Sequence, residues 1–468
     1  MPDIIKLNLQ GEKIALPLDT IEQYNVSGPR YTSYPTAPEW RECGESLFID
    51  RLRQGADTEV RPLSVYTHLP FCEERCHFCA CNVVVTKKKE QAEKYLGYIQ
   101  GELKKLAPFI GSKRKVVQYH WGGGTPTYLS EEQIEKYFRT TREYLDFDDD
   151  AEIAIETDPR VTTLGQLVLL RTLGFNRLSF GVQSFDPEVQ QAIKRIQPFD
   201  MVKKYYEQCR AQGFEAVNFD LVYGLPGQTQ ASFTRTLEQT IQLKPDRIAL
   251  YNFAYLPDAH PHQKRIKGGR MLQGLEKFRL FTTAIEMFTS NGYRFIGLDH
   301  FALESDELAV AGKNGTLHRN FMGHTTRAGS DLLALGVTSI SMFDDAYFQN
   351  ERKLAFYYRR LDEGEFPICR GIQLDEDDRL RRDVINGLLC NGVVLKKEIN
   401  ARYGIDFDDY FQDMKSQLEH HQKMCLILES TAEIRLTMLG RLFNRNVCMT
   451  FDRYLKQPGG GHSFSKTV

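Results

Sequence analysis

The sequence predicts an α/β protein: an incomplete parallel barrel of the (β/α)6 type with an extended N-terminal arm and a mainly helical C-terminal domain. Between about residues 63 and 300, short apolar or β-branched runs alternate with longer amphipathic stretches. Parallel strands need crossover helices between them, so this alternation is typical of a parallel sheet. Beyond about residue 365 the alternation stops and the pattern becomes helical.

The expected strands are the seven apolar runs of the first region. They are 63–69, 116–121, 152–157, 177–182, 216–223, 247–253 and 295–301. The helical patterns between them are 91–105, 131–144, 164–173, 187–195, 201–212, 232–243 and 271–290. Six or seven such units suit a barrel or an incomplete barrel, whose chemistry lies at the carboxyl ends of the strands.

Three domains are expected on this basis: an arm or lid over 1–45, a catalytic barrel over 46–365 and a mainly helical domain over 366–468. In the arm, residues 24–35 are rich in turn formers and aromatic residues, which favours an extended segment. Helices of the C-terminal domain are expected at 375–390, 396–403, 408–420 and 437–446.

Composition excludes several classes of function. With 468 residues, 41% of them hydrophobic, the chain can bury a large core. A formal net charge of −2 provides no field that favours nucleic acid or an anionic membrane. No apolar run approaches the roughly 18 residues of a membrane span, and the first residues lack the pattern of a secretory signal. We therefore expect a cytoplasmic protein without disulfides.

Four of the ten cysteines fall within ten residues, as Cys72-x-x-x-Cys76-x-x-Cys79-x-Cys81. Clustered thiolates in a chain that is not exported indicate a metal centre. A zinc site is the main alternative, but zinc motifs usually add a second Cys-x-x-Cys pair downstream, which this chain lacks. Iron–sulfur clusters are held by cysteine thiolates. We expect Cys72, Cys76 and Cys79 to bind one, with Cys81 nearby but not a ligand.

Glycine and polar residues follow several of the predicted strands. Gly122-Gly123-Gly124-Thr125-Pro126-Thr127 comes directly after the second strand, where glycine lets backbone approach a ligand closely. An ordinary tight turn is the plainer interpretation. Glu156, Gln183 and Asp220 lie at the ends of three further strands. Each alone is more often a satisfied polar group, but their recurrence at one rim favours a site.

Together with Tyr223-Gly224-Leu225-Pro226-Gly227-Gln228-Thr229, these motifs resemble the radical S-adenosylmethionine superfamily. Along nearly its whole length the sequence resembles the oxygen-independent coproporphyrinogen III oxidases. The supporting stretches are 28–36, 79–82, 300–302, 318–321 and 381–385. The three-cysteine motif specifies only the superfamily. The arm, the Cys79-x-Cys81 step and the C-terminal domain narrow the resemblance to the oxidase family.

The resemblance implies one [4Fe-4S] cluster, with Cys72, Cys76 and Cys79 as its protein ligands, and two S-adenosylmethionine molecules. The first would chelate the open iron. Four positions match residues that contact this first molecule: Tyr66, Gly123, Glu156 and Ile340. The resemblance implies a catalytic role for Tyr66 and Glu156 as well. Positions matching contacts of the second are Phe78, Gly124, Thr125, Gln183, Arg195, Asp220 and Ala254. Arg195 could pair with its carboxylate, and Asp220 could take ribose hydroxyls.

The implied activity is the decarboxylation of two propionates of coproporphyrinogen III to vinyl groups in haem biosynthesis. The implied partner is a low-potential electron donor of the flavodoxin or ferredoxin class, and a monomer is expected. We hypothesise that the arm acts as a lid. Arg30, in the arm, is a candidate for binding substrate carboxylates, with an ordinary surface arginine as the equal alternative.

Three alternatives share the core motifs. A haem chaperone of the same superfamily would bind haem without oxidising a porphyrinogen, but such chains generally lack the arm. A radical methyltransferase or an anaerobic haem-degrading enzyme would also use two S-adenosylmethionines. An iron–sulfur scaffold without catalysis would form no 5′-deoxyadenosine after reduction.

Overall fold

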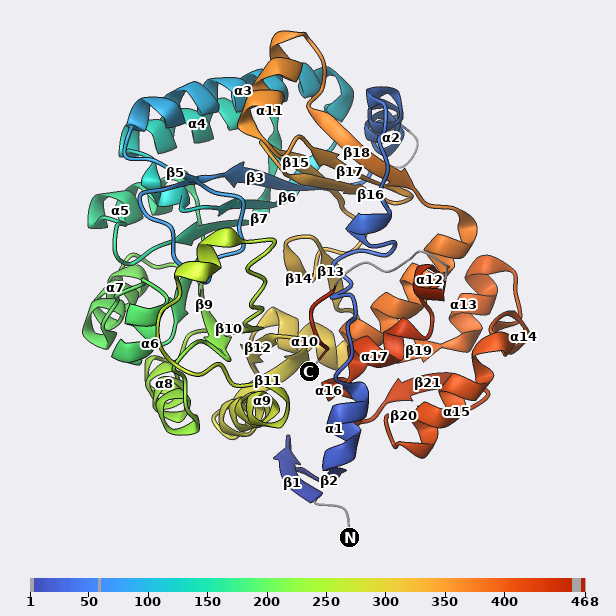
Figure 1. The fold of residues 1–468 in the computed structure, drawn as a ribbon. Coiled ribbons are helices and arrows are strands. Elements are labelled where there is room, and N and C mark those ends of the chain that lie inside the picture. Colours follow the sequence, from blue (N-terminus) through green and yellow to red (C-terminus); the bar gives the residue numbers. More distant parts are fainter. Residues whose placement is uncertain (1–3, 58–59, 457–463, 468) are drawn as a thin grey trace.

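The fold is known from a computed structural model, which describes residues 4–57, 60–456 and 464–467. A sheet of twelve strands forms its centre, in the order β11-β12-β10-β9-β8-β7-β6-β3-β15-β16-β17-β18 (Figure 1). Six successive strands of this sheet run parallel. They are β3 (Leu63–Leu69), β6 (Lys115–Gly123), β7 (Asp146–Thr157), β8 (Arg177–Gln183), β9 (Ala216–Tyr223) and β10 (Arg247–Asn252). The predicted incomplete (β/α)6 barrel is confirmed.

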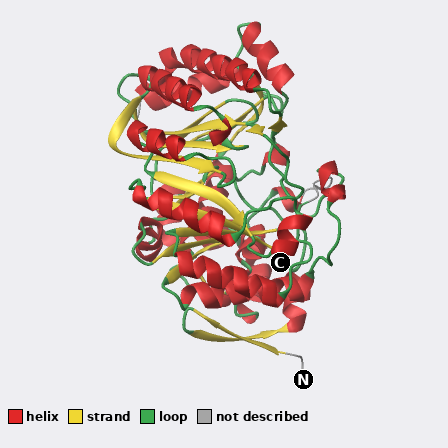
Figure 2. Cartoon of the chain, turned by 90° about the vertical axis from the view of Figure 1, so that its left-hand side faces the viewer, coloured by secondary structure: helices red, strands yellow, loops and turns green. Residues whose placement is uncertain are grey.

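Helices cover the outer face of the curved sheet (Figure 2). They are α3 (Lys89–Ile110), α4 (Glu131–Tyr144), α5 (Leu164–Leu173), α6 (Pro187–Ala192), α7 (Phe199–Ala211), α8 (Gln230–Leu243) and α9 (Gly274–Thr289). Local sequence sets several of their starts: Ser130 and Thr163 each form a capping box with a glutamine three residues later. This agrees with the alternation predicted from the sequence.

The prediction of a single seventh strand at 295–301 is wrong. That run forms a hairpin of β11 (Tyr293–Gly297) and β12 (His300–Leu303), and β12 pairs antiparallel with β10. The chain reverses because Gly297 and Leu298 both take positive φ, at 136° and 55°. Such a turn inside an apolar run has no signal in hydrophobic periodicity.

Beyond β3 the sheet continues through strands that the alternation did not predict. β15 (Asp331–Leu335) runs parallel to β3. It is followed by the antiparallel strands β16 (Ile340–Phe343), β17 (Ala346–Asn350) and β18 (Ile368–Gln373). The helix α11 (Leu354–Asp362) connects the last two. The sheet therefore has antiparallel strands at both ends and does not close.

The N-terminal residues are only partly extended. β1 (Ile4–Leu9) and β2 (Glu12–Pro17) form a hairpin beside α9, and α1 (Leu18–Tyr24) follows. The extended segment comprises the residues after α1, up to the short helix η1 (Ala37–Glu39) and then α2 (Glu45–Asp57). It passes between the barrel and the C-terminal helices (Figure 1).

The C-terminal region is mainly helical, but its elements differ in detail from the prediction. Its helices are α12 (Glu376–Asn386), the π-turn η4 (Gly387–Asn391), α13 (Lys396–Tyr403), α14 (Phe407–Tyr410), α15 (Lys415–Lys423), α16 (Met438–Leu442) and α17 (Asn444–Met449). The helix predicted at 408–420 is divided into α14, the 3-10 helix η5 (Gln412–Met414) and α15, and the helix predicted at 437–446 is divided into α16 and α17. A small antiparallel sheet of β19 (Val393–Leu395), β21 (Glu433–Leu436) and β20 (Ile427–Glu429) was not predicted, because strands this short show no clear period.

None of the helices among the described residues is both long enough and apolar enough to cross a membrane.

Candidate active site

The cysteine loop is held at the carboxyl end of β3 by backbone contacts. Cys72 ends the short strand β4 (Phe71–Cys72), which pairs in parallel with β5 (Val84–Val85) and so closes the loop on itself. The backbone N–H of His77 donates to the carbonyl of Ile193 at 2.9 Å. Nε2 of His262 lies 2.6 Å from the carbonyl of Cys79. Contacts from two distant segments therefore fix where the three thiols lie.

Each of the three thiols lies against a polar group of the protein. Sγ of Cys72 is 3.6 Å from the Thr125 hydroxyl. Sγ of Cys76 accepts from Arg195 Nη1 at 3.6 Å and from Arg160 Nη2 at 3.8 Å. Sγ of Cys79 accepts from the backbone N–H of Cys81 at 3.4 Å. Hydrogen bonds to cluster sulfurs are one of the means by which proteins tune an iron–sulfur centre.

The thiols differ in how readily they lose a proton. Burial raises the pKa of Cys72 to about 11, with the neighbouring Cys79 and Cys76 adding to the shift. The hydrogen bond with the Cys81 side chain lowers the pKa of Cys79 to about 7, and the pKa of Cys81 rises well above its usual value in return. Cys81 therefore lies beside the ligand candidates and supports the thiolate of one of them.

These residues fit an iron–sulfur cluster better than a single metal ion. Among residues 4–57, 60–456 and 464–467, no three His, Cys, Asp or Glu side chains gather closely enough to hold one ion. In a four-iron cluster each thiolate binds a different iron, so the sulfurs stand farther apart than around one ion. The donors facing all three sulfurs suit thiolate ligands, which are acceptors when bound.

The glycines after β6 allow the strand end to approach its neighbours closely. A Cβ at Gly124 would lie 2.7 Å from the carbonyl of Phe71, beside the cysteine loop. Gly123 takes φ +119°, and a Cβ there would lie 2.6 Å from the His68 ring. Only glycine fits at these positions. The ordinary-turn interpretation therefore misses a close approach of the backbone to the cysteine loop.

Glu156 is held in place at the end of β7. Its Oε2 accepts from the backbone N–H of Gly123 at 3.0 Å, and its Oε1 lies 3.4 Å from Nε2 of His120. Burial alone would raise the pKa of Glu156, but His120 and the Gly123 N–H outweigh it, and the pKa lies below its usual value. A carboxylate held ionised suits the ammonium or ribose hydroxyls of a nucleoside ligand.

Tyr66 lies beside this carboxylate. Its ring stacks on His120, with centroids 5.9 Å apart at 12°, and its hydroxyl is 3.1 Å from Nδ1 of His68. Burial, with a contribution from Glu156, raises the pKa of Tyr66 well above its usual value. The hydroxyl therefore stays neutral and can both donate and accept.

Arg195 is buried beside both the cysteine loop and β8. Its Nη1 lies 3.1 Å from Oδ2 of Asp158, and its Nη2 donates to the carbonyl of Gly181 at 2.9 Å. Burial opposes the charge of Asp158, but Arg195 and Arg160 together lower its pKa to about 2. Arg195 is thus already paired internally, and a ligand carboxylate would add to an existing ion pair.

Gln183 has a strained backbone, with φ +64°, at a bulge at the end of β8. Positive φ is uncommon for a residue with a side chain and often marks a functional site.

Asp220 lies on β9, facing the same rim. Burial first, and then Glu156, raise its pKa to about 7. Its Oδ1 accepts from Asn218 Nδ2 at 2.7 Å. Two nearby carboxylates with separated pKa values are a common feature of functional sites.

Three further predicted residues are Phe78, within the cysteine loop, Ala254 and Ile340. Phe78 packs against an apolar cluster that includes Phe253, and Gln263 Nε2 donates to the carbonyls of both Phe78 (3.4 Å) and Ala254 (3.2 Å). Ile340 lies on β16, separated by β15 from β3, and packs in a different apolar cluster with Trp40.

Sequence reasoning missed four polar residues of this rim. Asp158 and Arg160 follow β7, and Arg160 donates both to Asp158 and to Sγ of Cys76. His68 lies beside Tyr66, and His120 lies beside Glu156. Asp158 could have been found, because it follows directly after a predicted strand. The two histidines lie inside strands, where a polar residue does not reveal what it faces.

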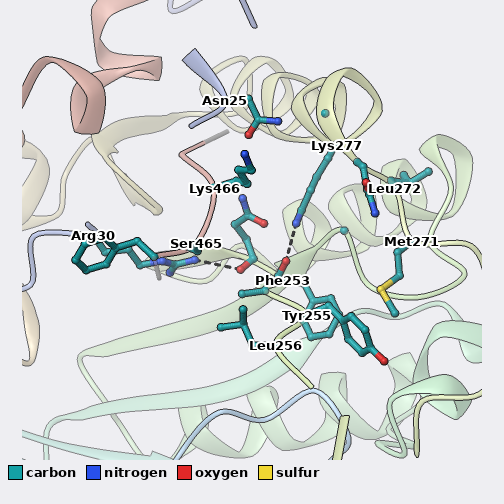
Figure 3. A pocket seen from close by; sticks show the side chains of 16 residues that line it. Asn25, Arg30, Phe253, Tyr255, Leu256, Met271, Leu272, Lys277, Ser465 and Lys466 are labelled. Atoms are coloured by element: carbon teal, nitrogen blue, oxygen red, sulfur yellow. Dashed lines mark hydrogen bonds between the residues drawn. The ribbon is translucent and has the colours of Figure 1, made fainter. Parts of the chain in front are cut away.

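Arg30 is more than a surface arginine. Its Nη2 donates to the carbonyl of Asn252 at 3.2 Å, and its Nη1 lies 3.6 Å from Asp299. It lines a cavity of about 340 Å³ at the carboxyl end of β10 (Figure 3).

The fold and this rim define a radical S-adenosylmethionine barrel, and comparison with known proteins agrees. Residues 66–240 match the model of the radical SAM superfamily, and residues 374–443 match that of the HemN C-terminal domain.

Similarity to individual proteins extends over almost the whole chain. The oxygen-independent coproporphyrinogen III oxidase of Salmonella typhimurium is 43% identical over 98% of this chain and 100% of its own. That of Synechocystis is 41% identical over 96% and 97%. The solved structure of coproporphyrinogen III oxidase from Escherichia coli, described as a radical SAM enzyme, superposes with a TM-score of 0.88 at 44% identity, covering 91% of this chain and 97% of that one. The chain belongs to the family of oxygen-independent coproporphyrinogen III oxidases.

Proposed function

We propose that the protein converts coproporphyrinogen III to protoporphyrinogen IX without oxygen, by oxidative decarboxylation of two propionate side chains to vinyl groups. The similarity to the Salmonella typhimurium enzyme along 98% of this chain carries the proposal, because it includes the barrel, the arm and the C-terminal region. Each propionate loses one hydrogen atom, one electron and carbon dioxide, and its two remaining carbons become the vinyl group.

As a member of this family the protein uses a [4Fe-4S] cluster and S-adenosylmethionine. When bound, they supply the 5′-deoxyadenosyl radical that takes the hydrogen from the propionate β-carbon. Cys72, Cys76 and Cys79 would hold the cluster, with the donors on their sulfurs tuning it. The protein's own task is to position the reactants and exclude water.

Tyr66, Gly123 and Glu156 would bind the S-adenosylmethionine at the cluster, and Ile340 is proposed from resemblance alone. The neutral Tyr66 hydroxyl can both donate and accept a hydrogen bond, whereas the ionised Glu156 beside it only accepts. For a second S-adenosylmethionine, the polar candidates are Gln183, Arg195, Asp220 and Thr125, and the remaining ones are Phe78, Gly124 and Ala254. The shared hydrogen bonds of Gln263 to the carbonyls of Phe78 and Ala254 support grouping these two residues in one binding site.

The wider assignments follow from the family. We propose a low-potential electron donor of the flavodoxin or ferredoxin class, a monomeric enzyme and a cytoplasmic location. The arm is proposed to act as a lid, since Arg30 reaches the carbonyl of Asn252 at the end of β10.

The test is anaerobic turnover of the reconstituted protein with reductant, S-adenosylmethionine and coproporphyrinogen III, followed by mass spectrometry. Protoporphyrinogen (or its oxidised porphyrin) together with 5′-deoxyadenosine is the expected result. 5′-Deoxyadenosine without a decarboxylated porphyrin would reject this substrate and point to another branch of the superfamily, and the absence of both would reject radical chemistry.

A further inference from the structure

Two adjoining cavities lie where the carboxyl end of β10 meets the arm and the C-terminal helices. The larger, of about 340 Å³, contains Lys277 and Arg30 (Figure 3). The smaller, of about 240 Å³, contains Arg319 and the start of β12. Arg30 and Asn252 line both, so Arg30 lies at their junction. Each cavity is close to the lower end of the range for small-molecule sites, roughly 300–1,000 Å³.

The smaller cavity is strongly cationic. Four arginines line it: they are Arg30, Arg319, Arg441 and Arg445. Among the residues that the structure describes, Asp299 is the one carboxylate in this lining. Arg445 is used structurally, since its Nε donates to the carbonyl of Pro29 at 2.9 Å and its Nη1 to that of Lys466 at 3.0 Å. Arg30 is the arginine that pairs with Asp299, at 3.6 Å.

Arg319 differs from Arg30 and Arg445 because some of its N–H donors lack an acceptor among the described residues. Its Nε and Nη1 are buried and make no hydrogen bond within the described part of the chain. Buried N–H donors without acceptors are costly unless a ligand supplies them. The charge of Arg319 also acts on His300. Burial first, and then this charge, lower the pKa of His300 to about 4. His300 therefore stays neutral and does not compete for an anion.

The walls around these cations are aromatic. Besides His300, five tyrosine and phenylalanine rings line the smaller cavity: those of Tyr223, Tyr251, Phe278, Phe281 and Phe321. Such a combination of apolar walls and a few fixed charges suits a flat apolar molecule that carries carboxylates. The cavity adjoins the rim described above, since Asp220 and Asp299 both act on the pKa of Tyr251, which burial raises well above its usual value.

We propose that this arginine-lined cavity binds the propionate carboxylates that the reaction leaves intact, with Arg319 as the main anchor and Arg30 as the second. The inference rests on the proposed function and names the binding residues for its substrate. A guanidinium can hold a carboxylate through two parallel N–H···O bonds. The substrate carries four carboxylates, of which two remain in the product.

The division between anchored and reacting propionates has a physical reason. A tight arginine pair stabilises a carboxylate in the ground state, so it would oppose the loss of carbon dioxide from that same group. Anchoring the two permanent carboxylates costs the reaction nothing, because they are equally charged before and after it. It also fixes which edge of the ring faces Glu156 and the cysteine loop.

The first test is binding to the reconstituted protein, measured by the fluorescence of coproporphyrin III, the stable oxidised form of the substrate. Arg319→Gln should weaken this binding roughly 10- to 100-fold, because it removes a charged pair with two hydrogen bonds. Arg319→Lys should recover part of the loss, and Arg30→Gln should give a smaller one. Arg235→Gln, at an exposed arginine of α8 that pairs with Asp186, is the matched control and should bind like the wild type.

The uncharged tetramethyl ester of coproporphyrin III separates charge recognition from apolar binding. The wild type should bind it more weakly than the free acid, and Arg319→Gln should bind both alike. The KM of Arg319→Gln for coproporphyrinogen III should rise above that of the wild type.

Equal affinity of the wild type, Arg319→Gln and Arg30→Gln for coproporphyrin III would overturn the inference, even if decarboxylation is observed. Binding that depends on Arg319 in a wild type that decarboxylates nothing would instead reject the proposed function and support the anion site. If Arg319→Gln fails to fold, as judged by circular dichroism, Arg30→Gln and the ester comparison decide the question.

Discussion

The cysteine-loop rim and the arginine-lined cavity, two neighbouring regions of this molecule, are built in opposite ways. The rim draws its polar residues from between Tyr66 and Asp220, and its charged groups have partners within the protein. The cavity combines Arg30 with residues of β12, β13 (His318–Asn320) and the C-terminal helices. Two buried donors of Arg319 find no acceptor among the residues that the structure describes.

The difference shows how the two regions are prepared for their ligands. A rim whose groups orient one another is rigid before any ligand arrives, which suits cofactors whose geometry must be reproduced in every turnover. A cavity in which one arginine has unsatisfied donors is complete only when an anion enters, which suits a substrate that binds and leaves in every turnover. Changes in one region should therefore leave the function of the other largely intact.

The largest effect is expected from Cys76→Ala. It removes a proposed cluster ligand, so formation of 5′-deoxyadenosine should fall at least 1,000-fold, to background, since catalysis in this family depends on the cofactor. Iron content and product should be measured after reconstitution. Binding of coproporphyrin III should persist, because the cavity does not include Cys76. The control is Cys425→Ser, an exposed cysteine in the C-terminal region. Full activity of Cys76→Ala would refute the assignment of the cluster.

Removal of residues 1–35 should impair the substrate reaction and spare the cofactor reaction, in contrast to Cys76→Ala. Decarboxylation should be abolished, because Arg30 and Thr32 line the cavity, whereas cleavage of S-adenosylmethionine should continue. Mass spectrometry of both products measures the two reactions separately. A second variant, in which residues 28–34 are replaced by a glycine–serine linker, keeps the β1–β2 hairpin and α1. Loss of both reactions in this variant would count against the role of the arm as a lid.

A smaller effect is expected from pH at Asp220. Its pKa of about 7, raised above the usual value by burial, leaves it partly protonated at neutral pH. The ionised form is the better acceptor for ribose hydroxyls, so affinity for S-adenosylmethionine should increase as pH rises through 7, by about tenfold between pH 6 and 8. Asp220→Asn should bind equally at all these pH values. Calorimetric titration would measure the affinity for S-adenosylmethionine at each pH. A pH dependence that persists in Asp220→Asn would mean that another titratable group causes the effect.

The smallest effect is expected from Tyr31→Phe. The buried Tyr31 hydroxyl donates to Oδ2 of Asp452 at 3.0 Å and ties the arm to the C-terminal region. Removing it should lower the free energy of unfolding by about 1–3 kcal/mol, because Asp452 loses a partner. Urea unfolding of this variant beside Tyr144→Phe, on the surface helix α4, gives the comparison. Equal stability of the two variants would mean that the arm is held by other contacts.

Much of the barrel could be predicted because its signal is local. Six of the seven expected strands lie where apolar runs predicted them, and α4 and α5 have the predicted bounds. The seventh failed because two positive-φ residues, Gly297 and Leu298, reverse the chain inside one apolar run. The short strands of the C-terminal sheet were missed because three or four residues carry no readable period.

The site divides in the same way. The spacing of Cys72, Cys76 and Cys79 predicted the cysteine loop, and the strand-end positions of Glu156 and Asp220 predicted their rim. The contacts of Arg160 with Cys76, and of His120 with Glu156, could not be predicted, because they depend on which strands are neighbours. Ile340 was inferred by resemblance alone, and the structure places it with Trp40.

Most barrel elements, the cysteine loop and the family could be inferred from the amino-acid sequence, because each depends on residues that are close together in the chain. Which charges face one another depends instead on three-dimensional packing, because it brings distant segments side by side. Arg30 and Arg319 lie 289 positions apart in the chain, and no local pattern marks them as lining the same cavity. Both line it because the arm passes between the barrel and the C-terminal helices (Figure 1).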